Sequence, residues 1–208
     1  MTAINSYTLL DFLDEIFAQK PDLLLIYAGH NEFYGALGAA SNESLGRFRG
    51  FVKLYLRLER LKIFILLRNG LGAARKWLGH LLHGDTTKPT ATLMERMVGE
   101  QTIPYKGPLY QIGRRQFEGN LRDILKRARK AGVKVMVSEL VSNFRDLPPF
   151  ISVKSDSFPP ANEVYRRAQA EERAGQYEEA KSDYIQAKDL DALRFRSTED
   201  FNQIVHRV

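Results

Sequence analysis

Two stretches of the chain share one order of patterns, a helical repeat of apolar residues followed by a short apolar run. The first repeat covers about 6–19, and the apolar run 23–27 follows shortly after Pro21. The second repeat covers about 117–128, Gly132 marks its end, and the run 133–137 follows. Apolar runs of this length are typical of strands in buried parallel sheets. The pattern predicts two helix–strand units of an α/β fold.

The boundaries of these helices can be predicted from capping residues. Ser6 or Thr8 is the expected N-cap of the first helix. Ser197 is the expected N-cap of a last helix over 198–208, which has acidic residues in its first turn. Because a helix followed by a strand is half of a βαβ unit, we expect a parallel partner strand before residue 1 and another strand after residue 208.

A long segment between the two units, about 45–83, alternates apolar and basic residues at helical spacing. Asn69-Gly70 is expected to interrupt it. The favoured interpretation is a helical insertion that buries its apolar side on the sheet domain and leaves its basic side in water. The alternatives are a lid beside a functional site and a basic amphipathic surface that rests on an anionic membrane.

The remaining segments differ in composition from the two units. Residues 84–113 are predicted to be mostly loop, and a proline-rich connection over about 147–160 marks a boundary. Beyond it, 162–190 is predicted to be a polar, alanine-rich pair of helices joined near Gly175, and Tyr177, Ala180, Tyr184 and Ala187 resemble one tetratricopeptide-type hairpin. The alternative is a helical hairpin without repeat ancestry, and in either case it must pack on another surface.

Composition excludes some kinds of site. With 44% hydrophobic and 27% charged residues among 208, the chain is expected to be globular, and it has no run of 18 apolar residues and no signal-peptide pattern at its start. The absence of cysteine excludes disulfides, thiolate ligands and thiol nucleophiles. His80 and His83, with Asp85 nearby, lack a clear third ligand, so no metal is expected. The net charge of +6 permits weak attraction to anions without specifying one, and the cellular compartment stays open.

Candidate chemistry follows the first apolar run, in Ala28-Gly29-His30-Asn31-Glu32. Ligands of open parallel sheets bind outside the carboxyl ends of the strands. Gly29 lets the backbone approach a ligand closely, and the Asn31 amide can donate to an oxyanion. Ser138, Glu139, Ser142 and Asn143 follow the second run and are expected at the same edge. The alternative is an ordinary junction whose polar residues cap and solvate the chain.

Gly29-His30-Asn31-Glu32 resembles the third conserved block of the SGNH (GDSL-like) hydrolases, which has glycine, any residue, asparagine and usually aspartate, here replaced by glutamate. Residues 27–35 (YAGHNEFYG) and 3–11 (AINSYTLLD) also resemble a bacterial subgroup that carries tetratricopeptide repeats. The resemblance implies an α/β fold with a three-layer, flavodoxin-like parallel sheet, incomplete at both ends and with helical insertions. It implies no cofactor.

The resemblance also implies roles for individual residues. Asn31 and Gly29 match the oxyanion block, and Ala3 stands where the family's second block has glycine. We expect His30, Glu32 and Glu139 to contact a small ester or acylated substrate. The family's serine nucleophile and its aspartate–histidine pair have no match in these 208 residues. We therefore expect an internal, catalytically inert piece of a longer hydrolase-like protein.

The expected organisation is an α/β core at 1–44 and 110–160, a basic helical insertion at 45–109, a tetratricopeptide-like hairpin at 161–190 and a return to the core at 191–208. An alternative function is a non-catalytic, hydrolase-like scaffold that binds a protein partner through the hairpin. A third hypothesis is a module for a membrane surface or a nucleic acid. Nucleic acid is not expected, because no base-stacking or groove-reading motif is present.

Overall fold

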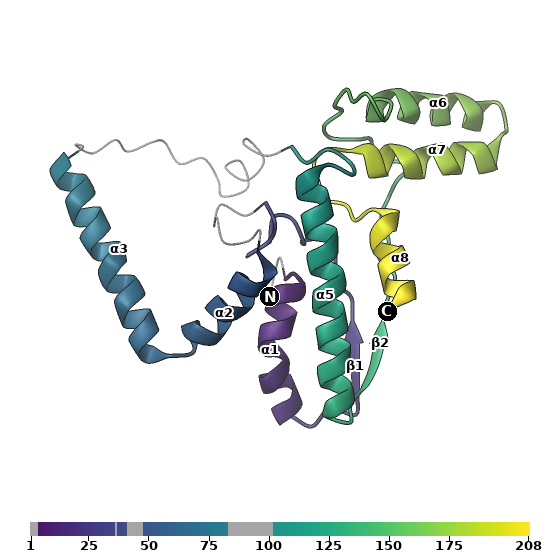
Figure 1. The fold of residues 1–208 in the computed structure, drawn as a ribbon. Coiled ribbons are helices and arrows are strands. Elements are labelled where there is room, and N and C mark those ends of the chain that lie inside the picture. The colour runs from purple at the N-terminus through teal and green to yellow at the C-terminus, as the bar shows by residue number, and fades with distance from the viewer. Residues whose placement is uncertain (1–3, 36, 41–47, 83–101) are drawn as a thin grey trace.

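The structure is a computed structural model that describes residues 4–35, 37–40, 48–82 and 102–208, and within α3 it places side chains only up to residue 72. Within these ranges it contains seven helices and two strands (Figure 1). The elements are α1 (Ser6–Ala18), β1 (Leu23–Ile26), α2 (Arg49–Glu59), α3 (Lys62–Leu82), α5 (Pro108–Lys130), β2 (Lys134–Val137), α6 (Ala161–Arg173), α7 (Tyr177–Leu190) and α8 (Glu199–Arg207). None of the described helices is both long enough and apolar enough to cross a bilayer.

The two helix–strand units are confirmed. β1 and β2 run parallel in register, from Leu23 opposite Lys134 to Ile26 opposite Val137. α1 precedes β1 and α5 precedes β2, and the two helices lie side by side against the strands (Figure 1). One face of the strand pair is thereby buried, by a cluster comprising Leu10, Leu13, Ile26 and Ile124.

The prediction of a three-layer, flavodoxin-like sheet is wrong. The described residues form one sheet of two four-residue strands, and most of the described chain is helical. Helices cover only one face of this sheet, because Leu25 and Met136, which pair across the strands, are 65% and 57% exposed on the other. The continuous apolar runs suggested strands buried on both faces. An apolar run predicts a strand, but it does not predict whether other elements cover both faces of that strand.

Several helix boundaries differ from the sequence predictions. The N-cap of α1 is Asn5, whose side-chain oxygen accepts a hydrogen bond from the backbone N–H of Thr8 at 3.1 Å. The N-cap of α8 is Thr198 instead of Ser197. α5 begins at Pro108, within the segment predicted to be loop. Proline suits the first turn of a helix because its missing N–H has no intrahelical partner there.

The helices of the basic segment are confirmed, but their packing is not as predicted. α3 continues through Asn69-Gly70, and the break lies instead at Arg60-Leu61, between α2 and α3. α2 buries Val52 against the core, whereas most of the described apolar side chains of α3 face solvent, as Leu66 does with 72% of its surface exposed. The favoured prediction that this insertion buries its apolar side is therefore wrong for α3.

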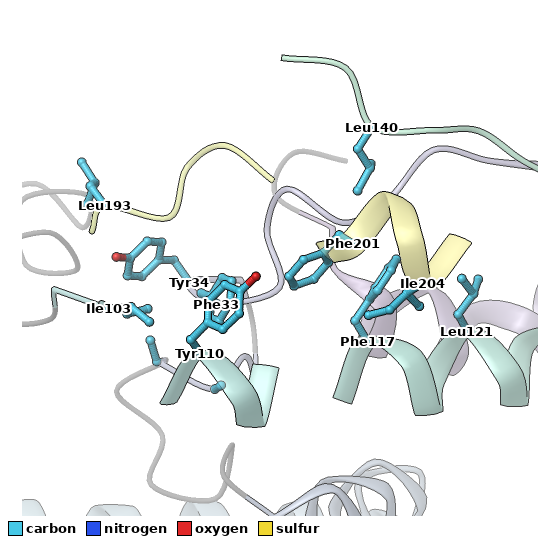
Figure 2. Packing of buried hydrophobic residues seen from close by; sticks show 12 residues of the cluster. Phe33, Tyr34, Ile103, Tyr110, Phe117, Leu121, Leu140, Leu193, Phe201 and Ile204 are labelled. Carbon is cyan, nitrogen blue, oxygen red and sulfur yellow. The ribbon is translucent and has the colours of Figure 1, made fainter. Parts of the chain in front are cut away.

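The largest core cluster joins the strand-end segment to α5 and α8 (Figure 2). Phe33 stacks on Tyr110 with ring centroids 5.8 Å apart, and Phe201 lies 5.0 Å from Phe117. Ile204 fills the space beside them. Because Phe33 is two residues beyond Asn31, this packing fixes where the candidate loop leaves the sheet.

The helical hairpin predicted for 162–190 is confirmed as α6 and α7. Gly175 turns the chain between them with a φ of +78°, a conformation that favours glycine. Ala168, Ala180 and Tyr184 are buried where the helices meet. The pair projects from the end of α5 opposite to β1 and β2 (Figure 1).

Candidate functional site

The loops that follow β1 and β2 meet at one edge of the strand pair, as predicted. The backbone N–H of Ser138 donates to the carbonyl of Ile26 at 2.9 Å and extends the ladder to this edge. Gly29 has a φ of +152°, and a Cβ there would lie 2.4 Å from Cδ1 of Leu140. Only glycine therefore allows the two loops this close an approach.

Asn31 lies in the turn that begins at this edge. The N–H of Gly35 donates to the Asn31 carbonyl at 2.8 Å and closes the turn. The side-chain nitrogen of Asn31 is 3.3 Å from the carbonyl oxygen of Ile4, near the start of α1. An amide nitrogen carries two hydrogens, and this contact uses one of them. The second N–H can donate to a ligand at the surface.

Glu32 points inward, and its side chain is buried with 3% of the residue exposed. Its two carboxyl oxygens accept hydrogen bonds from the backbone N–H and the hydroxyl of Ser6, at 2.7 and 2.6 Å. The amide of Asn120 donates to the same hydroxyl at 2.9 Å. Burial raises the pKa of Glu32 to about 7, although the bonds from Ser6 oppose this shift. This geometry gives Glu32 an anchoring contact to α1 and α5 in place of an exposed, substrate-facing position.

His30 is held on both sides of its ring. Its Nδ1 accepts a hydrogen bond from the backbone N–H of Ser197 at 3.2 Å, and its Nε2 lies 3.1 Å from the hydroxyl of Tyr27. Partial burial and then the nearby Lys188 ammonium lower the pKa of His30. The neutral ring that follows carries its proton on Nε2, because Nδ1 is an acceptor.

The loop after β2 is covered by α8. Asn202 accepts from the backbone N–H of Leu140 at 2.8 Å and donates to its carbonyl at 3.2 Å. Glu139 is exposed, and its carboxylate lies 2.7 Å from Nε2 of His206. Glu139 and Asn31 therefore belong to neighbouring loops of one edge, but Glu139 already has a partner on α8.

Sequence reasoning missed a buried charge cluster behind His30. Lys188, at the end of α7, lies 3.1 Å from a carboxylate oxygen of Asp189 and 2.7 Å from one of Glu199. Burial raises the pKa of Asp189 to about 6, while Lys188 opposes the shift. Adjacent Lys-Asp residues at a helix end resemble an ordinary solvated pair, so residue type alone gave no signal of burial.

Arg194 is the second feature that the sequence did not reveal. Its guanidinium is almost fully buried and donates to the carbonyls of Ile103 and Asp189, at 2.9 and 2.6 Å. It lies 5.1 Å from the centre of the Tyr110 ring. This residue links three segments that are far apart in sequence, and its contacts are those of a structural cation.

Some candidate residues lie where the structure gives no description. Ala3, proposed for the second oxyanion block, is outside the described residues, as are His83 and Asp85. His80 belongs to the part of α3 whose side chains are not described. In the described ranges, no three His, Asp or Glu side chains gather as metal ligands would.

The edge can donate hydrogen bonds but holds no nucleophile–base pair among the described residues. His30 contacts a tyrosine and a backbone N–H, and His206 contacts a glutamate, so neither bonds a serine hydroxyl. What the geometry offers is the half-buried Asn31 amide, a group of the kind that can donate to negative charge. No known protein family, curated protein or solved structure matches this chain.

Proposed function

We propose that residues 28–32 supply the oxyanion-donating loop of a site that hydrolyses esters or transfers acyl groups, with Asn31 as the donor. The observation that carries the proposal is the Asn31 amide, which stands at the carboxyl edge of β1 and β2 with one N–H available. Negative charge develops on the carbonyl oxygen in such reactions, and an amide N–H is a suitable donor for it.

Pre-organisation supports this role. The turn at Asn31 is closed by its bond to Gly35, and the next residue, Glu32, is bonded to Ser6 inside the protein. Phe33 is fixed in the aromatic core. The donor is thus held in place before any substrate arrives, which lowers the reorganisation cost in the transition state.

The resemblance of Gly29-His30-Asn31-Glu32 to the third SGNH block also supports the proposal. Its substrate would be a small ester or acylated molecule that binds at the surface beside Asn31. The nucleophile and the general base would come from residues outside those that the structure describes. Because Gly29 has no side chain, the loop can lie close to Leu140, and this would leave room for a substrate carbonyl to reach the Asn31 amide.

The test is Asn31→Ala in the complete gene product, assayed with a panel of p-nitrophenyl esters. We expect kcat to fall about a hundredfold or more, with a smaller change in KM, as loss of an oxyanion donor does. Asn69→Ala is the matched control, because Asn69 is an exposed asparagine on α3, outside the candidate edge. Equal kcat values for the wild type and Asn31→Ala would exclude this role.

A second candidate function is a non-catalytic scaffold whose α6–α7 hairpin binds a protein. Its supporting observation is Tyr177, an aromatic residue 69% exposed at the start of α7. Large aromatic residues on a surface are enriched in protein interfaces. A photo-crosslinking residue at position 177 of the complete protein is expected to capture one defined partner in the native cells. The same probe at exposed Lys154 should not, and equal labelling at both positions would exclude the hairpin as the binding surface.

A further inference from the structure

An open groove of about 510 Å³ lies between α1, α2 and α5, away from the candidate loop. Leu10 and Leu56 are its apolar lining residues, and all its other lining side chains are charged. Six of these are basic and three are acidic, which leaves an excess of three positive charges. The charged residues are Asp11, Asp14, Lys53, Arg57, Arg60, Asp123, Lys126, Arg127 and Lys130.

The carboxylates of the groove are already paired. Lys53 lies 2.8 Å from Asp123, and Arg60 bonds Asp11 and Asp14 at 3.1 and 2.9 Å. Arg127 shares Asp14 with Arg60. The carboxylate charges are thus neutralised by cations within the groove.

The positive excess belongs to three other side chains, Arg57, Lys126 and Lys130. All three are exposed, and none has an ion pair with another described residue. Arg57 is on α2, whereas Lys126 and Lys130 are one turn apart on α5. Cations that converge from two helices on a concave surface attract an anion more strongly than isolated surface lysines do.

Exposed apolar residues adjoin this groove. Leu54 lies one turn before Arg57 on α2 and is exposed, as is Phe51. α3, the next helix along the chain, also has exposed apolar residues, Ile63, Leu66, Leu67 and Leu71. Over 48–82 the chain has eight arginines and lysines and only one acidic residue, Glu59. A soluble anion would explain the groove, but it would not explain the apolar residues beside it.

Helices that lie in a membrane surface combine a basic polar side with exposed large apolar residues. We propose that the groove binds the phosphate of anionic lipid headgroups while the exposed apolar residues of α2 and α3 enter the lipid surface. An acidic protein partner would match the charge, but clusters of basic residues beside aliphatic side chains fit phosphate above an acyl layer more closely. The proposal is independent of the function proposed for Asn31.

The experiment is co-sedimentation of the full chain with two kinds of vesicle. One is pure phosphatidylcholine, and in the other a third of the lipid is phosphatidylglycerol. We expect binding to the anionic vesicles alone, weakening steeply as salt is added because exposed charges are screened. The chain's one tryptophan, Trp77, is within α3, so quenching of its fluorescence by brominated lipid should report contact of α3 with the acyl region.

Two sets of substitutions distinguish the effect of the groove residues from the effect of the net charge of the protein. Arg57→Glu with Lys126→Glu and Lys130→Glu should weaken vesicle binding about a hundredfold or more, because each basic residue near an anionic surface contributes about fivefold. The control carries the same change in charge on α6, α7 and the loop before them, with Lys154→Glu, Arg166→Glu and Lys181→Glu. All three control residues are exposed. We expect the control to lose severalfold less affinity than the groove variant.

The apolar contribution has its own variant, Ile63→Ser with Leu67→Ser and Leu71→Ser, which should abolish quenching by brominated lipid. These residues are exposed, so circular dichroism should show an unchanged fold. If the groove triple variant unfolds, Lys130→Glu alone replaces it, because Lys130 ends α5 in solvent.

Three results would overturn the proposal. The first is equal binding to neutral and anionic vesicles, or binding to neither. The second is an equal loss of affinity in the groove variant and the control, which would leave only a net-charge effect. The third is calorimetric binding of inorganic phosphate that the groove variant abolishes, without vesicle binding by the wild type. That result would assign the groove to a soluble anion.

Discussion

The pairs α6–α7 and α2–α3 each consist of two helices joined by a short turn, but they bury their side chains differently. α6 and α7 contain many alanines and charged residues, and they pack against each other along their length (Figure 1). α2 and α3 contain many leucines and aromatic residues, yet the described contacts between them lie near the corner, where Phe64 is 5.8 Å from Tyr55 and Arg68 bonds Glu59. The more apolar pair is the less packed one.

Shape explains the difference. Small residues such as Ala168 and Ala180 let α6 and α7 approach closely, and Tyr184 fills the space that remains between them. α3 presents bulky Ile63, Leu66 and Leu67, and no described element offers them a complementary surface. Apolar side chains favour burial, but whether two helices of one chain bury them against each other depends on how well their surfaces fit.

The largest expected effect comes from a pair of truncations that tests this contrast. Tyr184→Ala should lower the free energy of unfolding by about 3 kcal/mol, because it leaves a cavity between α6 and α7 and removes the bond to Glu172. Leu66→Ala on α3 should change it by less than about 0.5 kcal/mol, since Leu66 is already exposed. Urea denaturation of both variants measures the difference. Similar losses in the two variants would mean that α3 is packed in solution.

A second test sharpens the contrast at the core, to which α2 is attached and α3 is not. Arg49 of α2 donates to the side chain of Asn120 at 2.9 Å. Asn120 donates to the hydroxyl of Ser6, and this hydroxyl donates to the buried carboxyl of Glu32. The pKa of Glu32 is about 7 in the folded protein, against a usual value of 4.5. The folded state holds this proton more tightly, so stability is lost as pH rises from 4.5 to about 7.

Glu32→Gln removes the titrating group and keeps a neutral side chain of the same shape. We expect the variant to gain stability relative to the wild type by about 3 kcal/mol as pH rises through this window. Urea denaturation just above pH 4.5 and again above pH 7 gives the two differences, in which other ionisable groups cancel. A constant difference between variant and wild type would show that Glu32 does not hold a proton in the folded protein.

The smallest expected effect compares two arginines of the basic segment. Arg49→Ala should cost about 1.5 kcal/mol, because the buried oxygen of Asn120 loses its donor and the carbonyl of Gly119 loses a bond of 2.7 Å. Arg68→Ala should have a much smaller effect, because Arg68 pairs with Glu59 at the surface, where both side chains are partly exposed to water. Thermal unfolding of both variants tests this. A greater loss from Arg68→Ala would place the stable attachment at α3.

Local patterns predicted much of the secondary structure. The repeats around Leu13 and Ile124 predicted the two helix–strand units. Gly132 predicted the turn of the second unit and Gly175 the turn between α6 and α7, because spacing and backbone conformation are local properties. The number of sheet layers could not be predicted, because exposure of Leu25 and Met136 depends on what packs above them. The uninterrupted helix through Asn69-Gly70 shows that a weak local breaker need not end a helix.

The candidate site was predicted in part. The edge at Gly29 and Asn31 follows from where the apolar run ends, and the structure brings it beside the loop at Glu139, as expected. Glu32 points inward because it bonds Ser6, 26 positions away, and His30 is held by a hydrogen bond from Ser197, 167 positions away. Spacing along the chain carries no signal for such contacts.

The most direct measurement of the contrast between the two helical pairs is amide hydrogen exchange along the full chain. Without vesicles, we expect strong protection across the packed segments of α6 and α7. We expect rapid exchange across α3, because most of its described apolar side chains are exposed. Anionic vesicles should then protect α3 and leave α6 and α7 unchanged. Equal protection of α3 and α6 in solution would contradict the account, because α3 would then already be packed against the protein.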